Sequence, residues 1–101
     1  MITEYIRYNL PTGLNPQFEA DYVKAADYLQ ASAVCMGCDL THCEEEPQRY
    51  ILRILWTSTA DHLQIFRSSE EFKGFFTLVQ PYIPHIEEMQ HYQFTAVQFS
   101  K

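Results

Sequence analysis

Residues 50–57 constrain the fold of this chain more than any other segment. They read YILRILWT, a β-rich apolar run that contains the only tryptophan, Trp56. Alternate side chains of a strand point to opposite faces, and here both faces are largely apolar. Strands of this kind are typical of a sheet that is covered on both sides. We therefore expect a central strand here, with a separate layer packed against each of its faces.

Two helical pieces follow this strand directly. Ser58 with Asp61, and Ser68 with Glu71, each combine a serine N-cap with an acidic residue three positions later. The second piece also has an apolar stripe at helical spacing, formed by Phe72, Phe75, Phe76 and Val79. Pro81 and Pro84 should end this helix and begin an irregular segment that runs to about residue 89.

The other elements are expected on both sides of this core segment. Residues 2–10 alternate as a strand, in which Glu4 is a misfit on the apolar side. Asn15 should cap a helix that has Pro16 at its first position. Its apolar face would consist of Phe18, Tyr22, Ala25, Ala26 and Leu29. Residues 33–41 should form a second strand with a bulge at Gly37, and residues 92–99 a fourth strand.

The resulting order is β-α-β-β-α-β, which predicts one α+β domain over residues 1–101 with a ferredoxin-like sheet. This layout places both helices on one face of the sheet. The other face needs a cover, and a second copy of the chain is the most economical one. We therefore expect a homodimer.

Charge and composition exclude several classes of partner. The formal net charge is -6, with 7 basic and 13 acidic residues. That balance argues against a nucleic-acid groove and against binding to an anionic membrane surface. No apolar run approaches the ~20 residues of a membrane span, and no secretory signal is evident at the N-terminus. With three cysteines and no export signal, we expect reduced thiols and a cytoplasmic location.

The motif W-T-S-x-x-x-H-L-x-x-F-x-x-S-x-x-F-x-x-F, from Trp56 to Phe75, resembles the antibiotic biosynthesis monooxygenase family. The resemblance implies a dimeric α+β barrel, in which two sheets face each other. The family includes cofactor-free quinol and polyketide oxygenases, heme-degrading enzymes and members with no known activity. It therefore implies a fold more firmly than a reaction.

The high share of aromatic residues, 15%, suggests a cavity as well as a core. We expect a pocket for a planar aromatic ligand between helices and sheet. Its expected lining is Tyr8, Tyr22, Trp56, Phe66, Phe72, Phe75 and Phe76, and Arg53 is a further substrate-binding candidate. The polar candidates are Asn9, Arg53, His62, His85 and His91. The alternative is that these aromatic side chains simply fill the core.

The resemblance gives Trp56 the role of lining this cavity, and His62 and Asn9 join it as catalytic candidates. A cofactor-free oxygenase must accept a proton from its substrate, which suits a histidine. The polyketide oxygenases of the family have an asparagine where this chain has Leu52. The heme-degrading members have a tryptophan and a ligand histidine where this chain has Ile65 and Phe75, so that route is not expected. A non-catalytic binding or sensor module of the same fold remains the alternative function.

Cysteines supply a second candidate site. Cys35 and Cys38 form a C-x-x-C pair, and His42 and Cys43 follow. These are ligand types for zinc or a redox thiol pair. Side chains three apart on a regular strand point to opposite faces, so the pair converges only if Gly37 bulges. We expect neither a metal nor a cofactor.

Overall fold

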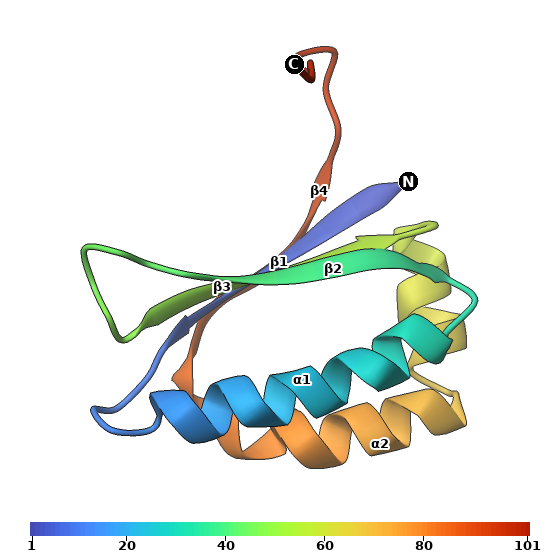
Figure 1. Cartoon of the computed structure of the whole chain (residues 1–101). Coiled ribbons are helices and arrows are strands. Elements are labelled where there is room, and N and C mark those ends of the chain that lie inside the picture. Colours follow the sequence, from blue (N-terminus) through green and yellow to red (C-terminus); the bar gives the residue numbers. More distant parts are fainter.

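The computed structural model describes all residues 1–101 and confirms the β-α-β-β-α-β order. The elements are β1 (Ile2–Asn9), α1 (Asn15–Ala31), β2 (Cys35–His42), β3 (Arg49–Trp56), α2 (Glu70–Val79) and β4 (Ile86–Gln93). A π-helical turn, η1 (Asp61–Phe66), precedes α2, and a 3₁₀ helix, η2 (Gln80–His85), follows it. The antiparallel sheet has the order β2-β3-β1-β4, and both helices lie on one side of it (Figure 1). None of the helices combines the length and the apolar character that a membrane crossing requires.

The central position of β3 confirms the expectation from its sequence. It pairs with β1 on one side and with β2 on the other. The side chains that face the helices are all at most 2% exposed, namely Tyr50, Leu52, Ile54 and Trp56. On the opposite face Ile51 and Leu55 are only half-buried in a single chain, and Arg53 is exposed. The helices therefore cover one face of β3, and the other face stays open in the single chain.

Helix α1 buries the expected apolar stripe but begins differently. Phe18, Tyr22, Ala25 and Leu29 are buried against the sheet. The prediction that Asn15 caps this helix was wrong, because Leu14 occupies the N-cap and no side chain accepts a hydrogen bond there. The Asn15 Nδ2 group instead donates to the Pro47 carbonyl oxygen at 2.7 Å and so ties the helix start to the β2–β3 loop.

The two helical pieces after β3 are capped by serines, one as predicted and one not. Ser58 Oγ accepts a hydrogen bond from the Asp61 backbone N–H at 3.0 Å, as expected. At α2, however, the cap is Ser69, whose Oγ accepts from the Phe72 N–H at 3.2 Å. Ser68 was the wrong choice, since its hydroxyl donates back to the carbonyl oxygen of Gln64 at 2.5 Å and so closes the preceding turn.

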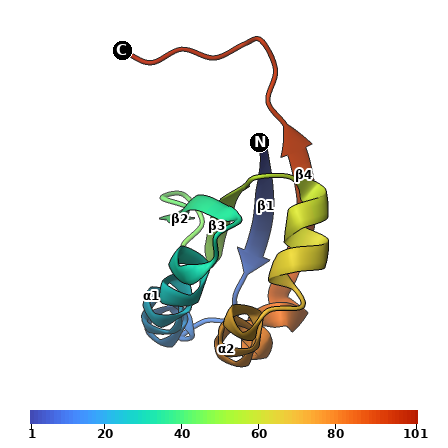
Figure 2. The ribbon, with the colours of Figure 1, turned by 90° about the vertical axis from the view of Figure 1, so that its right-hand side faces the viewer.

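Strand β4 begins earlier in the chain than predicted. It covers Ile86–Gln93, and residues 94–101 leave the sheet as a tail (Figures 1 and 2). In this register Met89 lies opposite Ile6 and His91 opposite Glu4. The alternation in 94–99 was misleading, because its apolar side chains reach no core; Val97 is 89% exposed. An edge strand with one neighbour needs only a few inward apolar side chains, so the many charged and polar residues of 86–93 did not indicate a strand.

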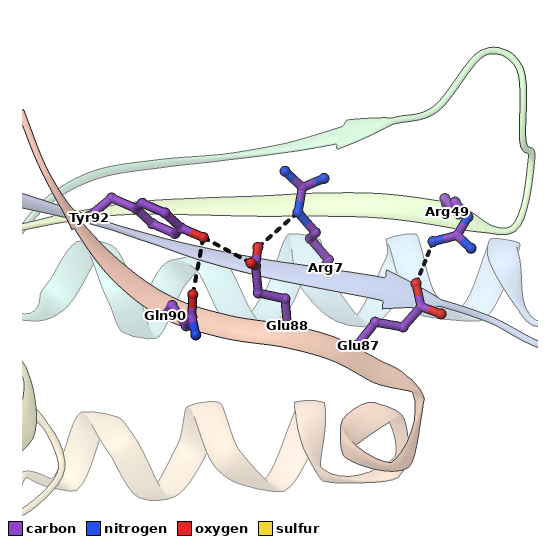
Figure 3. Close-up of polar contacts among 6 residues, drawn as sticks. All are labelled: Arg7, Arg49, Glu87, Glu88, Gln90 and Tyr92. Carbon is purple, nitrogen blue, oxygen red and sulfur yellow. Dashed lines mark hydrogen bonds and ion pairs between the residues drawn. The ribbon is translucent and has the colours of Figure 1, made fainter.

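The face of the sheet away from the helices mixes ion pairs with apolar groups. Figure 3 shows Arg7 paired with Glu88 at 2.9 Å and Arg49 paired with Glu87. The Tyr92 hydroxyl also donates to Glu88, at 2.8 Å. Beside these pairs lie half-buried apolar side chains, Tyr5, Ile51 and Leu55. This open face is the surface that the sequence predicts to be covered by a second copy.

Candidate functional site

The space between sheet and helices contains a cavity of about 190 Å³. Of its 16 lining residues, 13 are hydrophobic, so the wall is overwhelmingly apolar. All seven aromatic residues that the sequence singled out belong to the lining. The polar part of the wall consists of three side chains, Glu4, His62 and Arg67. The aromatic residues therefore enclose a space as well as forming a core.

Glu4, the misfit in the alternation of β1, is explained by this cavity. Its side chain points inward and is only 2% exposed. The indole Nε1–H of Trp56 donates a hydrogen bond to Glu4 Oε1 at 3.0 Å. Burial raises the pKa of Glu4, and the Trp56 hydrogen bond and the positive charge of Arg67 partly oppose that rise. The tryptophan thus joins a buried carboxyl group to the apolar wall.

His62 lies at the same end of the cavity, on the π-helical turn η1. Turns of this kind are rare and occur frequently at functional sites. The imidazole stacks on the indole of Trp56, with ring centroids 4.2 Å apart and planes 11° apart, and it is 4% exposed. Burial lowers the pKa of His62 to about 4, with smaller contributions from Arg67 and His91. The ring is therefore neutral at pH 7, and one of its nitrogens is free to accept a proton.

A second histidine joins this group from the edge of the sheet. The Nε2 atom of His91, on β4, lies 2.8 Å from His62 Nδ1. The other ring nitrogen of His62, Nε2, lies 3.7 Å from Glu4 Oε1. Burial and the charge of Arg67 lower the pKa of His91. Glu4, His62 and His91 thus form a row of polar side chains. Because His91 is half-buried, this row extends from the cavity wall to the protein surface.

A pair of tyrosines provides polar atoms in another part of the wall. The hydroxyls of Tyr8 and Tyr22 are hydrogen-bonded to each other, and the two side chains are 1% and 4% exposed. Burial raises the pKa of Tyr8 to about 12, so the hydroxyl stays neutral near pH 7. The aromatic rings around them offer no other hydrogen-bond partner to either hydroxyl.

Three of the expected polar residues lie outside the cavity. Asn9 is exposed and donates to Glu87 at 3.4 Å, because its position in β1 points away from the helices. Arg53 lies on the open face of the sheet and pairs with Asp39 of β2. His85 is half-buried in η2 and does not line the cavity. The structure thus brings His62 and the aromatic residues together and leaves Asn9 and Arg53 outside.

The cysteines do not gather a metal-ligating group. Gly37 does interrupt the β2 register, so the expected bulge is present, and both Cys35 and Cys38 border one shallow surface depression. The three cysteines are free thiols. Burial raises the pKa of Cys35 and of Cys38, which favours the unreactive thiol form. The ligand-type side chains that do converge are Glu4, His62 and His91, with one ligand atom from each within 4.8 Å of the others.

The sequence contained a sign of Glu4 but little sign of its partners. An acidic residue on the apolar side of a strand indicates a buried charge with a specific partner. That partner, Trp56, became evident only from the register, in which Ile2 pairs with Trp56. His91 is one of the polar candidates named from the sequence, but its position opposite Glu4 follows only from the observed strand register.

Comparisons with known proteins agree with this fold. No family model matches the chain. An uncharacterised protein of Bacillus subtilis (strain 168), YczJ, is 26% identical over 93 residues, which cover 92% of this chain and 98% of that protein. Among solved structures, a protein of Bordetella bronchiseptica named as an antibiotic biosynthesis monooxygenase is similar with a TM-score of 0.79 and 28% identity, over 93% of this chain and 96% of that one.

A third relative is named a cofactor-independent oxygenase. It is SnoaB from Streptomyces nogalater, solved as a mutant, with a TM-score of 0.72 and 18% identity over 97% of this chain and 94% of that chain. At this identity the likeness shows the fold alone. Together these structures confirm the ferredoxin-like α+β fold and the resemblance to the antibiotic biosynthesis monooxygenase family.

Proposed function

We propose that this protein is a cofactor-independent monooxygenase that oxidises a hydroquinone-like aromatic compound inside the cavity. The observation that supports this most is the wall itself, which is largely apolar and carries a neutral imidazole beside Trp56 that faces the enclosed space. An apolar wall binds a planar ring, and a single polar end orients its hydroxyl group. The fold shared with the monooxygenase structures supports the same reaction class.

The size of the cavity narrows the substrate class. An apolar cavity of about 150 Å³ is known to hold benzene. At about 190 Å³, this cavity has room for a ring of one-ring hydroquinone size and little more. A polycyclic aromatic substrate would need more room. Phe72 and Phe76 on α2 are only partly buried, so their movement could provide it.

The proposed chemistry needs the protein chiefly as a base and a container. The substrate hydroxyl gives its proton to His62, and the resulting anion gives electrons to oxygen. One oxygen atom enters the ring and the other leaves as water, so a hydroquinone and O₂ give a hydroxyquinone and water. The substrate supplies all the electrons. Exclusion of bulk water by the aromatic wall strengthens the attraction between this anion and the protonated His62.

The test is oxygen uptake by chelator-treated protein with a panel of one-ring hydroquinones and, for comparison, anthrones. Trp56→Ala should lose substrate binding, because the platform for the ring is removed. His62→Ala should still bind substrate but turn over more slowly, by the roughly 10²–10⁴-fold typical of a lost general base. Uptake no faster than the uncatalysed oxidation in wild type would refute the enzyme.

One observation favours the alternative, a non-catalytic small-molecule-binding module. Burial lowers the pKa of His62 to about 4, which makes the imidazole a weak base. Quenching of Trp56 fluorescence by hydroquinones, without any oxygen uptake, would support that reading. Neither uptake nor quenching would mean that the aromatic residues serve the core alone.

We also propose that the chain forms a homodimer through the open face of its sheet. The support is the set of half-buried apolar groups there, Tyr5, Ile51 and Leu55, next to the ion pairs of Figure 3. Light scattering should give twice the 11.9 kDa mass of the chain. A stable monomer at micromolar concentration would contradict this.

A further inference from the structure

Three side chains with metal-ligand chemistry meet at the end of the cavity next to Trp56. Glu4 comes from β1, His62 from the π-helical turn and His91 from the edge strand β4. One ligand atom of each lies within 4.8 Å of the others. Residues so distant in the sequence meet here only because β4 pairs with β1 in the observed register, which sets His91 opposite Glu4.

The set has the composition that a transition-metal site requires, and its ligand atoms lie near one another. Two imidazoles and one carboxylate form the ligand set of many iron and zinc sites. Atoms bound to one ion at about 2.1 Å lie roughly 3.0–3.4 Å apart. His62 offers a different nitrogen to each neighbour, with Nδ1 2.8 Å from His91 Nε2 and Nε2 3.7 Å from Glu4 Oε1. Only one of these nitrogens can bind a given ion, and the set with one atom from each residue spans up to 4.8 Å, so one side chain has to move closer before all three reach the ion.

The surroundings already hold two of the three groups in place. The Trp56 indole N–H fixes one carboxylate oxygen of Glu4 at 3.0 Å, and its ring stacks on His62. Such outer contacts orient the ligands of metal sites. His91 lies half-buried on an edge strand, so it is the arm that is free to adjust. A carboxylate buried to 2% exposure also gains most from a positive ion, since a neutral indole is its only direct hydrogen-bond donor.

We propose that Glu4, His62 and His91 form a binding site for one divalent transition-metal ion, such as Zn²⁺, Fe²⁺ or Co²⁺. Two imidazole ligands select these ions over Mg²⁺ and Ca²⁺, which prefer oxygen ligands. The cavity borders the site, so a small ligand has room to reach the ion. An ion bound to His62 occupies the nitrogen lone pair that would otherwise accept the proton of the substrate. The metal-bound state and the base-catalysed reaction proposed above are therefore alternative states of one site.

The experiment uses Co²⁺ as the probe on chelator-treated, full-length protein. We expect one equivalent to bind, with visible absorption bands of coordinated Co²⁺ and quenching of the fluorescence of Trp56, the only tryptophan. Glu4→Gln and His91→Gln each remove one ligand and keep the side-chain volume. Each substitution should raise the Kd for Co²⁺ by more than the roughly 10–100-fold that the loss of an outer-shell contact causes. Far-UV circular dichroism checks that both variants fold.

Two matched controls separate this site from others. His85→Gln removes a histidine outside the cluster, and Cys38→Ser tests the thiols; both should leave the Co²⁺ titration unchanged. The proposal fails if wild type shows no saturable binding, if both ligand variants bind as tightly as wild type, or if Cys38→Ser abolishes binding. No readout involves a substrate, so failure of the oxygenase proposal would leave this result intact.

Discussion

The Tyr8–Tyr22 pair yields a prediction in which two changes cost less than one. Each hydroxyl is buried and has the other as its hydrogen-bond partner. Tyr8→Phe leaves the Tyr22 hydroxyl buried and unpaired, and Tyr22→Phe does the reverse. Each should therefore lower the free energy of unfolding by about 1–3 kcal/mol, while removal of both hydroxyls should be nearly neutral. Simple addition would give about 2–6 kcal/mol, so the expected coupling is at least about 2 kcal/mol.

The measurement is equilibrium urea unfolding of wild type, both single variants and the double variant. Far-UV circular dichroism and Trp56 fluorescence should report coincident transitions with an unchanged slope. All samples need one protein concentration, because a dimer gains stability with concentration. Tyr28→Phe is the matched control, since that ring is 39% exposed and its loss of a hydroxyl should stay within about 0.5 kcal/mol.

Two outcomes would refute this reasoning. If both single variants are as stable as wild type, water inside the cavity satisfies the hydroxyl that remains. If the double variant loses the sum of the two single losses, the hydroxyls act independently and do not bond to each other. Because burial raises the pKa of Tyr8 to about 12, the result should not change between about pH 6 and pH 9.

Three further predictions concern packing and assembly. Gly74→Ala should lower the stability of the fold by about 1 kcal/mol, because the new methyl group would overlap the ring of Tyr28. In a Tyr28→Ala background the same substitution should raise the stability. Gly37→Ala places its methyl group in open space and should leave thermal unfolding unchanged. Ile51→Asp should halve the mass in light scattering and keep the fold, whereas a persistent dimer would exclude the open face as the interface. Deletion of residues 94–101, all exposed, should leave the circular dichroism spectrum unchanged.

Sequence patterns predicted the fold where an element buries a regularly spaced apolar face. Strand β3 and the stripe of α2 were found because their apolar side chains repeat at the period of the structure. Strand β4 was predicted too late in the chain, because an edge strand is held by backbone pairing with β1, and that pairing requires no particular side chains. Caps such as Ser69 were displaced by one residue because neighbouring serines have the same chemistry.

The candidate site was also only partly predictable from the sequence. Its apolar wall was predictable, because aromatic residues at helical spacing point to one side. Its polar end was only half predictable: His62 follows Trp56 closely, but Glu4 and His91 reach it through strand register. Register depends on long-range pairing, which a local pattern does not contain. Asn9 and Arg53 were wrong for a local reason, because each alternates with inward-facing neighbours on its strand and so points to the open face.

The tail beyond β4 has a practical consequence for handling the protein. Residues 94–99 read FTAVQF, a stretch without charge, proline or glycine that continues directly from an edge strand. Such six-residue stretches stack readily into fibrils when they are left exposed. Aggregation of concentrated samples should therefore begin with contacts between these stretches of different molecules. A solubility tag or a single lysine placed here should delay that aggregation more than the same change at the N-terminus.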